Sequence, residues 1–296
     1  MNTDQITQKI AAGQGFIAAL DQSGGSTPKA LRAYGVADDE WNGDDEMFAK
    51  IHEMRSRIIS SPAFTGEKIL GAILFGKTMD GEVGGKPTPA ALLDKGVAPF
   101  IKIDKGLEDE ANGVQLMKPM PEFDALLTRA KALGVYGTKE RSVIQSANAQ
   151  GIAAIVAQQF EVGEQVLAHG MMPILEPEYN IKAEDRAEGE DILKTEILKH
   201  LDALDDGKQV MLKLSIPVKA NQYKDLVDHP KCLKVVALSG GFDRAEACEK
   251  LAQNTGMIAS FSRALLDDLR AGMSDDEFDA ALGEAVGSIC NASVEG

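Results

Sequence analysis

The sequence predicts an α/β protein with the (β/α)₈ TIM-barrel fold, and three observations support this prediction. Short apolar segments alternate with longer segments of helical periodicity eight times along the chain. Charged and polar residues gather at the C-terminal ends of the apolar segments, where barrels carry their active sites. The length of 296 residues suits one barrel of about 250 residues with insertions. We therefore expect residues 1–296 to form a single barrel domain.

The predicted strands are short and mostly uncharged until near their ends. A helical segment separates each strand from the next, which predicts parallel strands joined by crossover helices. In chain order the strands are Phe16–Asp21, Lys68–Phe75, Pro99–Asp104, Tyr136–Ile144, Met171–Glu176, Gln209–Ile216, Lys234–Ser239 and Met257–Ser262.

The intervening segments carry apolar residues at helical spacing, as Leu193, Ile197 and Leu201 do. Such stripes are typical of helices that pack on a sheet. Two irregular insertions, Asp38–Glu46 and Gly81–Pro89, are expected to be solvated loops, although either could instead cover a site.

The charge balance excludes some classes of partner. Lys and Arg total 31 against 46 for Asp and Glu, which gives a net charge of −15. At long range this field should repel nucleic acid and anionic membranes. A small pocket lined with Lys, Arg and backbone N–H groups can still bind an anionic sugar phosphate, because it inverts the potential locally.

The N-terminal residues form neither a basic leader nor a signal-peptide core, and no apolar run reaches the ~18 residues of a membrane span. The three cysteines, Cys232, Cys248 and Cys290, lack CxxC spacing and an even count, which suits a reducing compartment. We expect a cytoplasmic protein, and a homo-oligomer is compatible with a barrel of this size.

Lys213 is the most informative charged residue. Strand alternation turns Leu212 and Leu214 outward against helices, so that Met211, Lys213 and Ser215 face into the barrel. A charge inside a strand is costly unless it lies near the C-terminal mouth of the barrel.

The same alternation brings other charged side chains to that mouth. Crowded cations and burial should lower the pKa of a lysine and leave some neutral amine to attack a carbonyl, as Schiff-base chemistry requires. An inward lysine can also be half of a structural ion pair, but ion pairing alone does not predict that charges from five strands gather at one end. The converging residues are Asp21, Lys102, Asp104, Lys139, Arg141, Glu176 and Glu178.

Two loops are candidates for phosphate binding. Ser239–Gly240–Gly241 follows the seventh strand, and Ser262–Arg263 follows the eighth, where barrels commonly bind phosphate with backbone N–H groups and a cation. The two glycines alone are more often a simple turn. A second phosphate could meet Ser23, Ser26 or Lys29 after the first strand, where a plain polar loop is an equal alternative.

Other chemistries have little support. The four histidines lie far apart in sequence without ligand-spaced partners, so we expect no metal and no other cofactor. No G-x-S-x-G motif occurs, which leaves no nucleophile elbow for a serine hydrolase.

Seven motifs, in barrel order over nearly the whole chain, resemble those of the class I fructose-bisphosphate aldolases. The sequence departs from the animal pattern in having Gln22 after the aspartate and in having no tyrosine near its C-terminus, so the resemblance assigns no tyrosine as the enamine proton donor. The matching segments are Ala19–Ser23, Ile101–Gly106, Thr138–Arg141, Pro173–Glu178, Met211–Lys213, Leu238–Gly241 and Phe261–Leu265.

The resemblance implies roles for the catalytic candidates. It implies that Lys213 forms the Schiff base, that Glu176 helps to form and break the carbinolamine, and that Asp21 orients the lysine and assists C–C cleavage. Lys102 and Lys139 would assist nearby.

For the remaining residues, the resemblance implies that Glu178 exchanges protons beside Glu176 and that Arg141 contacts the phosphate at the aldehyde end. Ser239, Gly240 and Arg263 would hold the phosphate at the ketone end.

The sequence therefore predicts reversible cleavage of fructose 1,6-bisphosphate to dihydroxyacetone phosphate and glyceraldehyde 3-phosphate, a step of glycolysis and gluconeogenesis. An aldolase for another phosphorylated sugar and a noncatalytic binding or scaffold barrel are the alternatives, because fold alone does not dictate activity.

Overall fold

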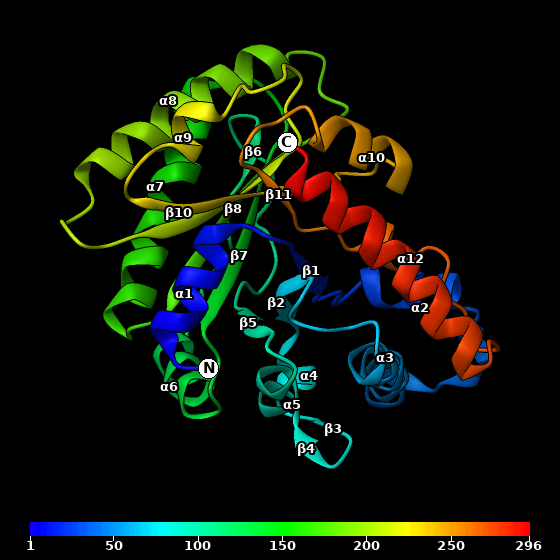
Figure 1. Cartoon of the computed structure of the whole chain (residues 1–296). Coiled ribbons are helices and arrows are strands. Elements are labelled where there is room, and N and C mark those ends of the chain that lie inside the picture. The colour runs from blue at the N-terminus through cyan, green and yellow to red at the C-terminus, as the bar shows by residue number, and fades with distance from the viewer.

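Eight parallel strands form the centre of the computed structural model, which describes residues 1–296 (Figure 1). Their order around the barrel is β1-β2-β5-β7-β8-β9-β10-β11, so each barrel strand lies beside the next one along the chain, as is usual for strands joined by short crossover connections. The strands are β1 (Phe16–Leu20), β2 (Ile69–Leu74), β5 (Ala98–Lys102), β7 (Gly137–Ile144), β8 (Met172–Tyr179), β9 (Val210–Ser215), β10 (Cys232–Leu238) and β11 (Ile258–Ala259). The predicted TIM-barrel fold is confirmed.

The barrel is nearly closed between its first and last strands. The backbone N–H of Ala19 on β1 donates to the carbonyl oxygen of Phe261, just after β11, over 3.3 Å. The registers then bring functional candidates level with one another, because Lys102 pairs with Lys139 and Arg141 pairs with Glu176.

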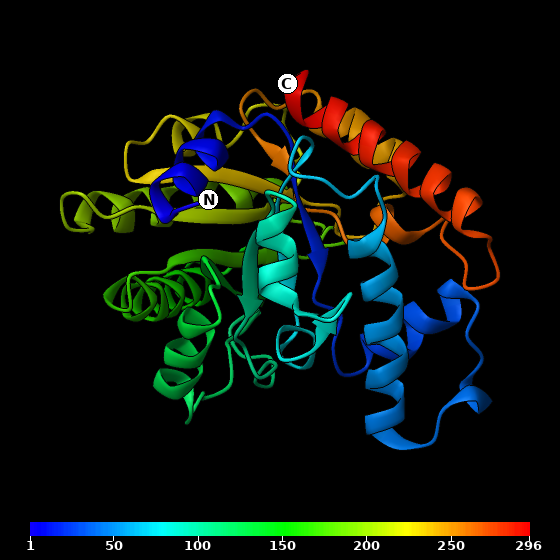
Figure 2. The ribbon, with the colours of Figure 1, turned by 60° about the horizontal axis from the view of Figure 1, so that its bottom comes forward.

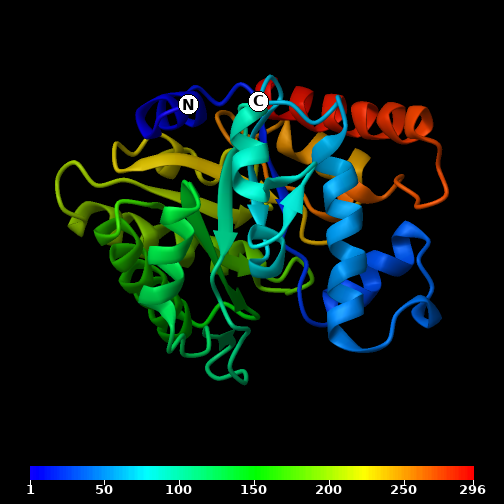
Figure 3. The ribbon, with the colours of Figure 1, turned by 90° about the horizontal axis from the view of Figure 1, so that it is seen from below.

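Helices surround the strands, with α2 and α3 on one side and α6 and α7 on the opposite side (Figure 2). Seen from below, α12 runs along one edge of the molecule (Figure 3), where it packs against α10, α11 and β11. The helices are α1 (Thr3–Ala12), α2 (Ser26–Tyr34), α3 (Gly43–Ser60), α4 (Gly76–Met79), α5 (Thr88–Asp94), α6 (Phe123–Ala132), α7 (Ala149–Ala168), α8 (Arg186–Ala203), α9 (Lys224–Val227), α10 (Arg244–Leu251), α11 (Arg263–Leu266) and α12 (Asp275–Val294), with a 3-10 turn η1 (Asp38–Glu40). None of them combines the length and the apolar character that a membrane crossing requires.

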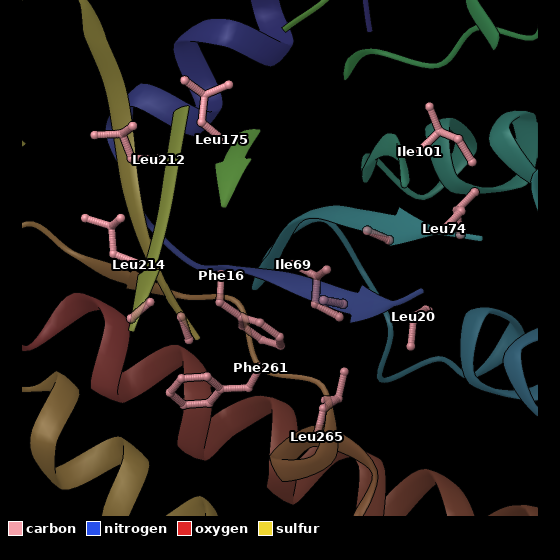
Figure 4. Packing of buried hydrophobic residues seen from close by; sticks show 14 of the residues in the cluster. Phe16, Leu20, Ile69, Leu74, Ile101, Leu175, Leu212, Leu214, Phe261 and Leu265 are labelled. Carbon is pink, nitrogen blue, oxygen red and sulfur yellow. The ribbon is translucent and has the colours of Figure 1, made fainter. Parts of the chain in front are cut away.

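Two apolar layers hold the barrel together. The larger lies between the strands and the helices, where Leu212 and Leu214 of β9 are fully buried; Figure 4 shows Phe261 of the same layer beside α12. The smaller fills the barrel interior and includes Met211, and Ile10 of α1 packs into it. Full burial of such side chains contributes about 1.5–3 kcal/mol each. Alternate residues of β9 therefore face opposite layers, as predicted.

The element bounds differ from the prediction at several ends. Asp21 and Asp104 lie just beyond their strands, and β8 continues to Tyr179. The insertion Gly81–Pro89 contains a short antiparallel hairpin of β3 (Glu82–Val83) and β4 (Lys86–Pro87) rather than only a loop. The insertion Asp38–Glu46 contains η1 and the start of α3, because its acidic residues suit the first turns of helices. A further strand, β6 (Val114–Gln115), pairs antiparallel with β7.

Candidate active site

A cavity of about 670 Å³ opens at the C-terminal ends of the barrel strands. This volume lies within the usual range of ligand sites, about 300–1,000 Å³. The structure brings thirteen of the fourteen predicted site residues to its walls, from strands, loops and helix starts far apart in the sequence. They are Asp21, Ser23, Ser26, Lys29, Lys102, Lys139, Arg141, Glu176, Glu178, Lys213, Ser239, Gly240 and Arg263.

Lys213 lies in the middle of β9 and is directed into the barrel. Its side chain is 5% exposed, and its Nζ lies 3.0 Å from Oε1 of Glu176 on the neighbouring strand β8. The ladder between β8 and β9 pairs only Ile174 with Met211 and Leu175 with Leu212, one step before the position of this ion pair.

The hydroxyl of Ser215 joins the two strands beyond that point. Its Oγ donates to the carbonyl oxygen of Tyr179 over 2.7 Å and accepts from the Tyr179 N–H over 3.1 Å. Glu176 and Lys213 thus face each other just beyond the last backbone pairing of β8 with β9, where the Ser215 side chain links the two strands instead.

Lys139 connects two carboxylates at the centre of the site. Its Nζ lies 2.7 Å from Oδ2 of Asp21 and 2.7 Å from Oε2 of Glu176, and its side chain is 3% exposed. Glu176 therefore contacts two ammonium groups, one at each oxygen, because Lys213 contacts the other.

Two further ion pairs extend this network toward the opening. Lys102 lies 3.1 Å from Asp104 and donates to Oγ of Ser23 over 3.0 Å. Arg141 pairs with Glu178 through its Nε. Four cations thus face four carboxylates, so charges of opposite sign alternate through the site.

For Lys139, this alternation gives the opposite of the lowered lysine pKa expected from crowded cations. Burial disfavours the charge of Lys139, but Asp21 and Glu176 outweigh that effect and raise its pKa. Burial likewise favours the neutral form of each carboxyl, but Lys139 and Lys213 hold the pKa of Asp21 and of Glu176 below the usual range. Crowding among cations therefore does not lower the pKa of Lys139, because each lysine has a carboxylate beside it.

The loops predicted to bind phosphate reach the same cavity. Gly240 has φ +63°, a left-handed conformation in which a side chain is strained, and Ser239 before it is buried. Gly241 is the one candidate that does not line the cavity. A Cβ built there would lie 3.4 Å from Nη2 of Arg263, so Gly241 provides space beside the guanidinium.

The second candidate loop leads into helix α2. The N–H of Ser23 donates to Oγ of Ser26 over 2.9 Å, and that hydroxyl donates back to the Ser23 carbonyl over 2.8 Å. These bonds shape the turn that starts α2, and Lys29 lies one turn into the helix.

The strand order places two arginines on opposite sides of the cavity. Arg141 lies on the fourth strand of the ring, and Arg263 follows the eighth. Lys213 lies on the sixth strand, between them. An elongated ligand with a negative charge at each end could thus contact both arginines and place its middle beside Lys213.

A buried glutamine outside the prediction supports the centre of the site. Gln159 of α7 accepts from the N–H of Glu176 over 3.1 Å. Its Nε2 donates to Oγ of Ser142 over 2.8 Å and to the carbonyl of Glu140 over 3.3 Å. Its burial could have been predicted from the sequence, since Gln159 is a polar residue within the apolar stripe of Ile155, Val156 and Phe160 on α7.

The histidines have partners outside the cavity. His169 contacts Asp124, and His229 contacts Asp202. No group of three or more His, Cys, Asp or Glu side chains is arranged to hold a metal ion.

Comparison with known proteins gives a family and a fold. The family model described as fructose-bisphosphate aldolase class-I matches residues 3–216. A crystallised fructose-bisphosphate aldolase from Plasmodium falciparum, in complex with TRAP and a small-molecule inhibitor, superposes with a TM-score of 0.79 at 17% identity, over 98% of this chain and 95% of that one. The protein Cgl0159 from Corynebacterium glutamicum gives a TM-score of 0.51 at 13% identity, over 98% and 92%. These low identities support the barrel fold alone.

Proposed function

Because the chain belongs to the class I fructose-bisphosphate aldolase family, we propose that it cleaves fructose 1,6-bisphosphate reversibly through a Schiff base on Lys213. The observation that carries the proposal is the position of Lys213, a buried lysine inside a barrel whose Nζ lies 3.0 Å from Glu176. A carboxylate at that distance reaches the atoms bonded to the lysine nitrogen and can exchange protons with them, and the lysine in its neutral form is a nucleophile.

The first half of the reaction builds the imine. The Lys213 nitrogen adds to the C2 carbonyl of the open-chain ketose and gives a carbinolamine. Glu176 donates a proton to its hydroxyl, which leaves as water, and the nitrogen lone pair forms the C=N bond of an iminium ion. Lys139 contacts the other oxygen of Glu176, which orients this carboxyl toward the reacting atoms.

The second half breaks the bond between C3 and C4. Asp21 takes the proton of the C4 hydroxyl, the C4 oxygen forms the aldehyde, and the electrons of the broken bond enter the iminium to give an enamine. The enamine then gains a proton at C3, so that proton loss and gain balance. Addition of water to the resulting iminium releases dihydroxyacetone phosphate and regenerates the Lys213 amine.

Two anion-binding groups favour a bisphosphate as the substrate. Arg141 lies on one side of the cavity, and Arg263, with Ser239 and Gly240, lies on the other. A charge-assisted hydrogen bond contributes about 1.5–3 kcal/mol, so occupation of both groups should give a clear advantage over a sugar with one phosphate.

Turnover of fructose 1,6-bisphosphate tests the proposal, with Lys213→Met as the essential variant. Lys234→Met is the matched control, because Lys234 lies on the next strand but at the N-terminal end of the barrel, where its Nζ faces Gly13. We expect the wild type and Lys234→Met to be active, also after treatment with a chelator, and Lys213→Met to be inactive.

Other outcomes favour the alternatives. Equal kcat/KM for fructose 1,6-bisphosphate and fructose 1-phosphate would contradict the two-phosphate assignment and favour an aldolase for another sugar phosphate. Absence of turnover with every sugar phosphate, in a folded wild type, would favour the scaffold alternative.

A further inference from the structure

The ion-paired residues Asp21, Lys139, Glu176 and Lys213 form the catalytic cluster, and a fully buried arginine lies near Asp21 without a carboxylate partner of its own. Arg55 of α3 is 0% exposed, and none of its nitrogens lies in ion-pair contact with an acidic side chain. A buried guanidinium that is not neutralised costs several kcal/mol, so its surroundings must stabilise it through hydrogen bonds. The residues that accept its hydrogen bonds indicate its structural role.

All of its hydrogen bonds go to two residues. Nη1 donates to Oγ1 of Thr78 on α4 over 2.7 Å. Nη2 donates to both oxygens of Gln22, over 2.5 Å to the backbone carbonyl and over 3.2 Å to Oε1. Gln22 directly follows Asp21, so Arg55 fixes the backbone at the end of β1.

The bond to Oε1 also decides the orientation of the Gln22 amide. An arginine has only donors, so the oxygen of the amide must face it and the NH₂ group must face away. That NH₂ group donates to Oγ of Ser262 over 2.6 Å. Ser262 lies on the cavity wall and directly precedes Arg263.

A hydroxyl has one hydrogen to donate. Because Gln22 donates to Ser262, the hydroxyl hydrogen of Ser262 is not used for that contact and is free to point at a ligand. With the opposite amide orientation, Ser262 would have to donate to Gln22 and would turn lone pairs toward an anion. Arg55 therefore determines, through the Gln22 amide, that the Ser262 hydroxyl can donate a hydrogen bond to a ligand.

We propose that Arg55 and Gln22 are positioning residues that make Ser262 a hydrogen-bond donor to the ketone-end phosphate of the substrate, beside Arg263. The inference rests on the proposed function, because that function places a phosphate at this wall of the cavity. It specifies how the Ser262 hydroxyl would contact that phosphate and assigns a purpose to a buried cation that the aldol steps do not use.

Reductive trapping with borohydride tests the inference, with two ligands that differ only in the phosphate. The concentration that gives half-maximal labelling is measured for dihydroxyacetone phosphate and for dihydroxyacetone, in the wild type and in Gln22→Met, Ser262→Ala and the double variant. Loss of a hydrogen bond to a charged group should raise the value for the phosphate ester about tenfold or more in each single variant. The value for dihydroxyacetone should change less than about twofold, since that ligand has no phosphate to bind.

The double variant tests the connection between the two residues. If Gln22 acts through Ser262, the double variant should bind dihydroxyacetone phosphate no more weakly than Ser262→Ala alone. Arg55→Lys, which keeps the charge but loses the paired contacts, should resemble Gln22→Met once its fold has been checked by circular dichroism.

Equal weakening of both ligands, additive losses in the double variant, or no change in Ser262→Ala would overturn the inference. Failure of the proposed function has a different signature, because the folded wild type would then form no reduced adduct with either ligand.

Discussion

Lys139 should hold the catalytic cluster together, and its removal should destabilise the protein in a pH-dependent way. At an effective dielectric constant of about 20, each of its 2.7 Å contacts corresponds to a Coulomb attraction of about 6 kcal/mol. Desolvation of the ammonium offsets most of this attraction. Loss of one partner from a buried pair typically costs about 3–5 kcal/mol. We expect Lys139→Met to lose about 5 kcal/mol of unfolding free energy near neutral pH, because two carboxylates lose the same cation.

The sign of the pH dependence follows from the pKa directions. In the wild type the pKa values of Asp21 and Glu176 are lowered, so these groups contribute stability above their unfolded pKa of about 4 and lose it as the pH falls. In Lys139→Met we expect burial to outweigh the remaining attraction of Lys213 and Lys102 for Asp21, whose only ion-pair contact is with Lys139, and so to raise its pKa. A raised pKa of Asp21 in the folded variant makes the variant least stable at high pH, where this buried carboxylate is charged and has lost its partner. Its deficit against the wild type should therefore shrink as the pH falls from about 8 to about 5.

Urea unfolding at the two pH values measures this effect. Lys86→Met is the control, because the pair of Lys86 with Asp94 is about 60% exposed on both sides and should contribute less than about 1 kcal/mol. Lys139→Met/Glu176→Gln should recover part of the lost stability, since it removes one uncompensated carboxylate. A deficit in Lys139→Met that is as small as in Lys86→Met, or that grows as the pH falls, would refute the reasoning.

Three further variants address the site. Glu176→Gln should lower kcat about 10²–10⁴-fold in steady-state assays, because the amide cannot exchange the carbinolamine proton, and an unchanged kcat would contradict its role. Arg263→Ala should raise the KM for fructose 1,6-bisphosphate about tenfold or more with a smaller change in kcat; a loss confined to kcat would argue against phosphate binding. Gln159→Leu, of similar size, should lower the unfolding free energy by about 1–3 kcal/mol, because the buried N–H of Glu176 loses its acceptor, and a neutral result in urea unfolding would dismiss that contact.

The fold could be predicted because its signals are local. Each strand is a short apolar run, and the alternation within β9 already separates Lys213 from Leu212 and Leu214. Parallel strands end at the same rim of a barrel, so charges at several strand ends had to converge there. Strand ends were less predictable, as β8 shows: its polar residues continue the strand because β7 pairs with it as far as Tyr179.

The pairing of charges within the site could not be predicted. The sequence shows that lysines and carboxylates meet, but which ones lie within 3 Å depends on strand register and on the separation of β8 from β9. The expectation of a pKa lowered by neighbouring cations was wrong for Lys139 for this reason.

Arg55 illustrates a different limit. An arginine in a helix usually extends to solvent, and only its place within the apolar stripe of Ile51, Met54 and Ile58 gave a hint of burial. Its acceptors, Thr78 and Gln22, come from other elements, so the contacts with them arise only when α3 packs beside the end of β1.

Peptide mapping by mass spectrometry, after borohydride reduction in the presence of dihydroxyacetone phosphate, most directly tests the claim that Lys213 is the imine-forming amine. We expect a single modified peptide, with the reduced three-carbon adduct on Lys213, in enzyme treated beforehand with a chelator. Modification of Lys139 or Lys102 in its place, or no adduct on a folded protein, would contradict the account.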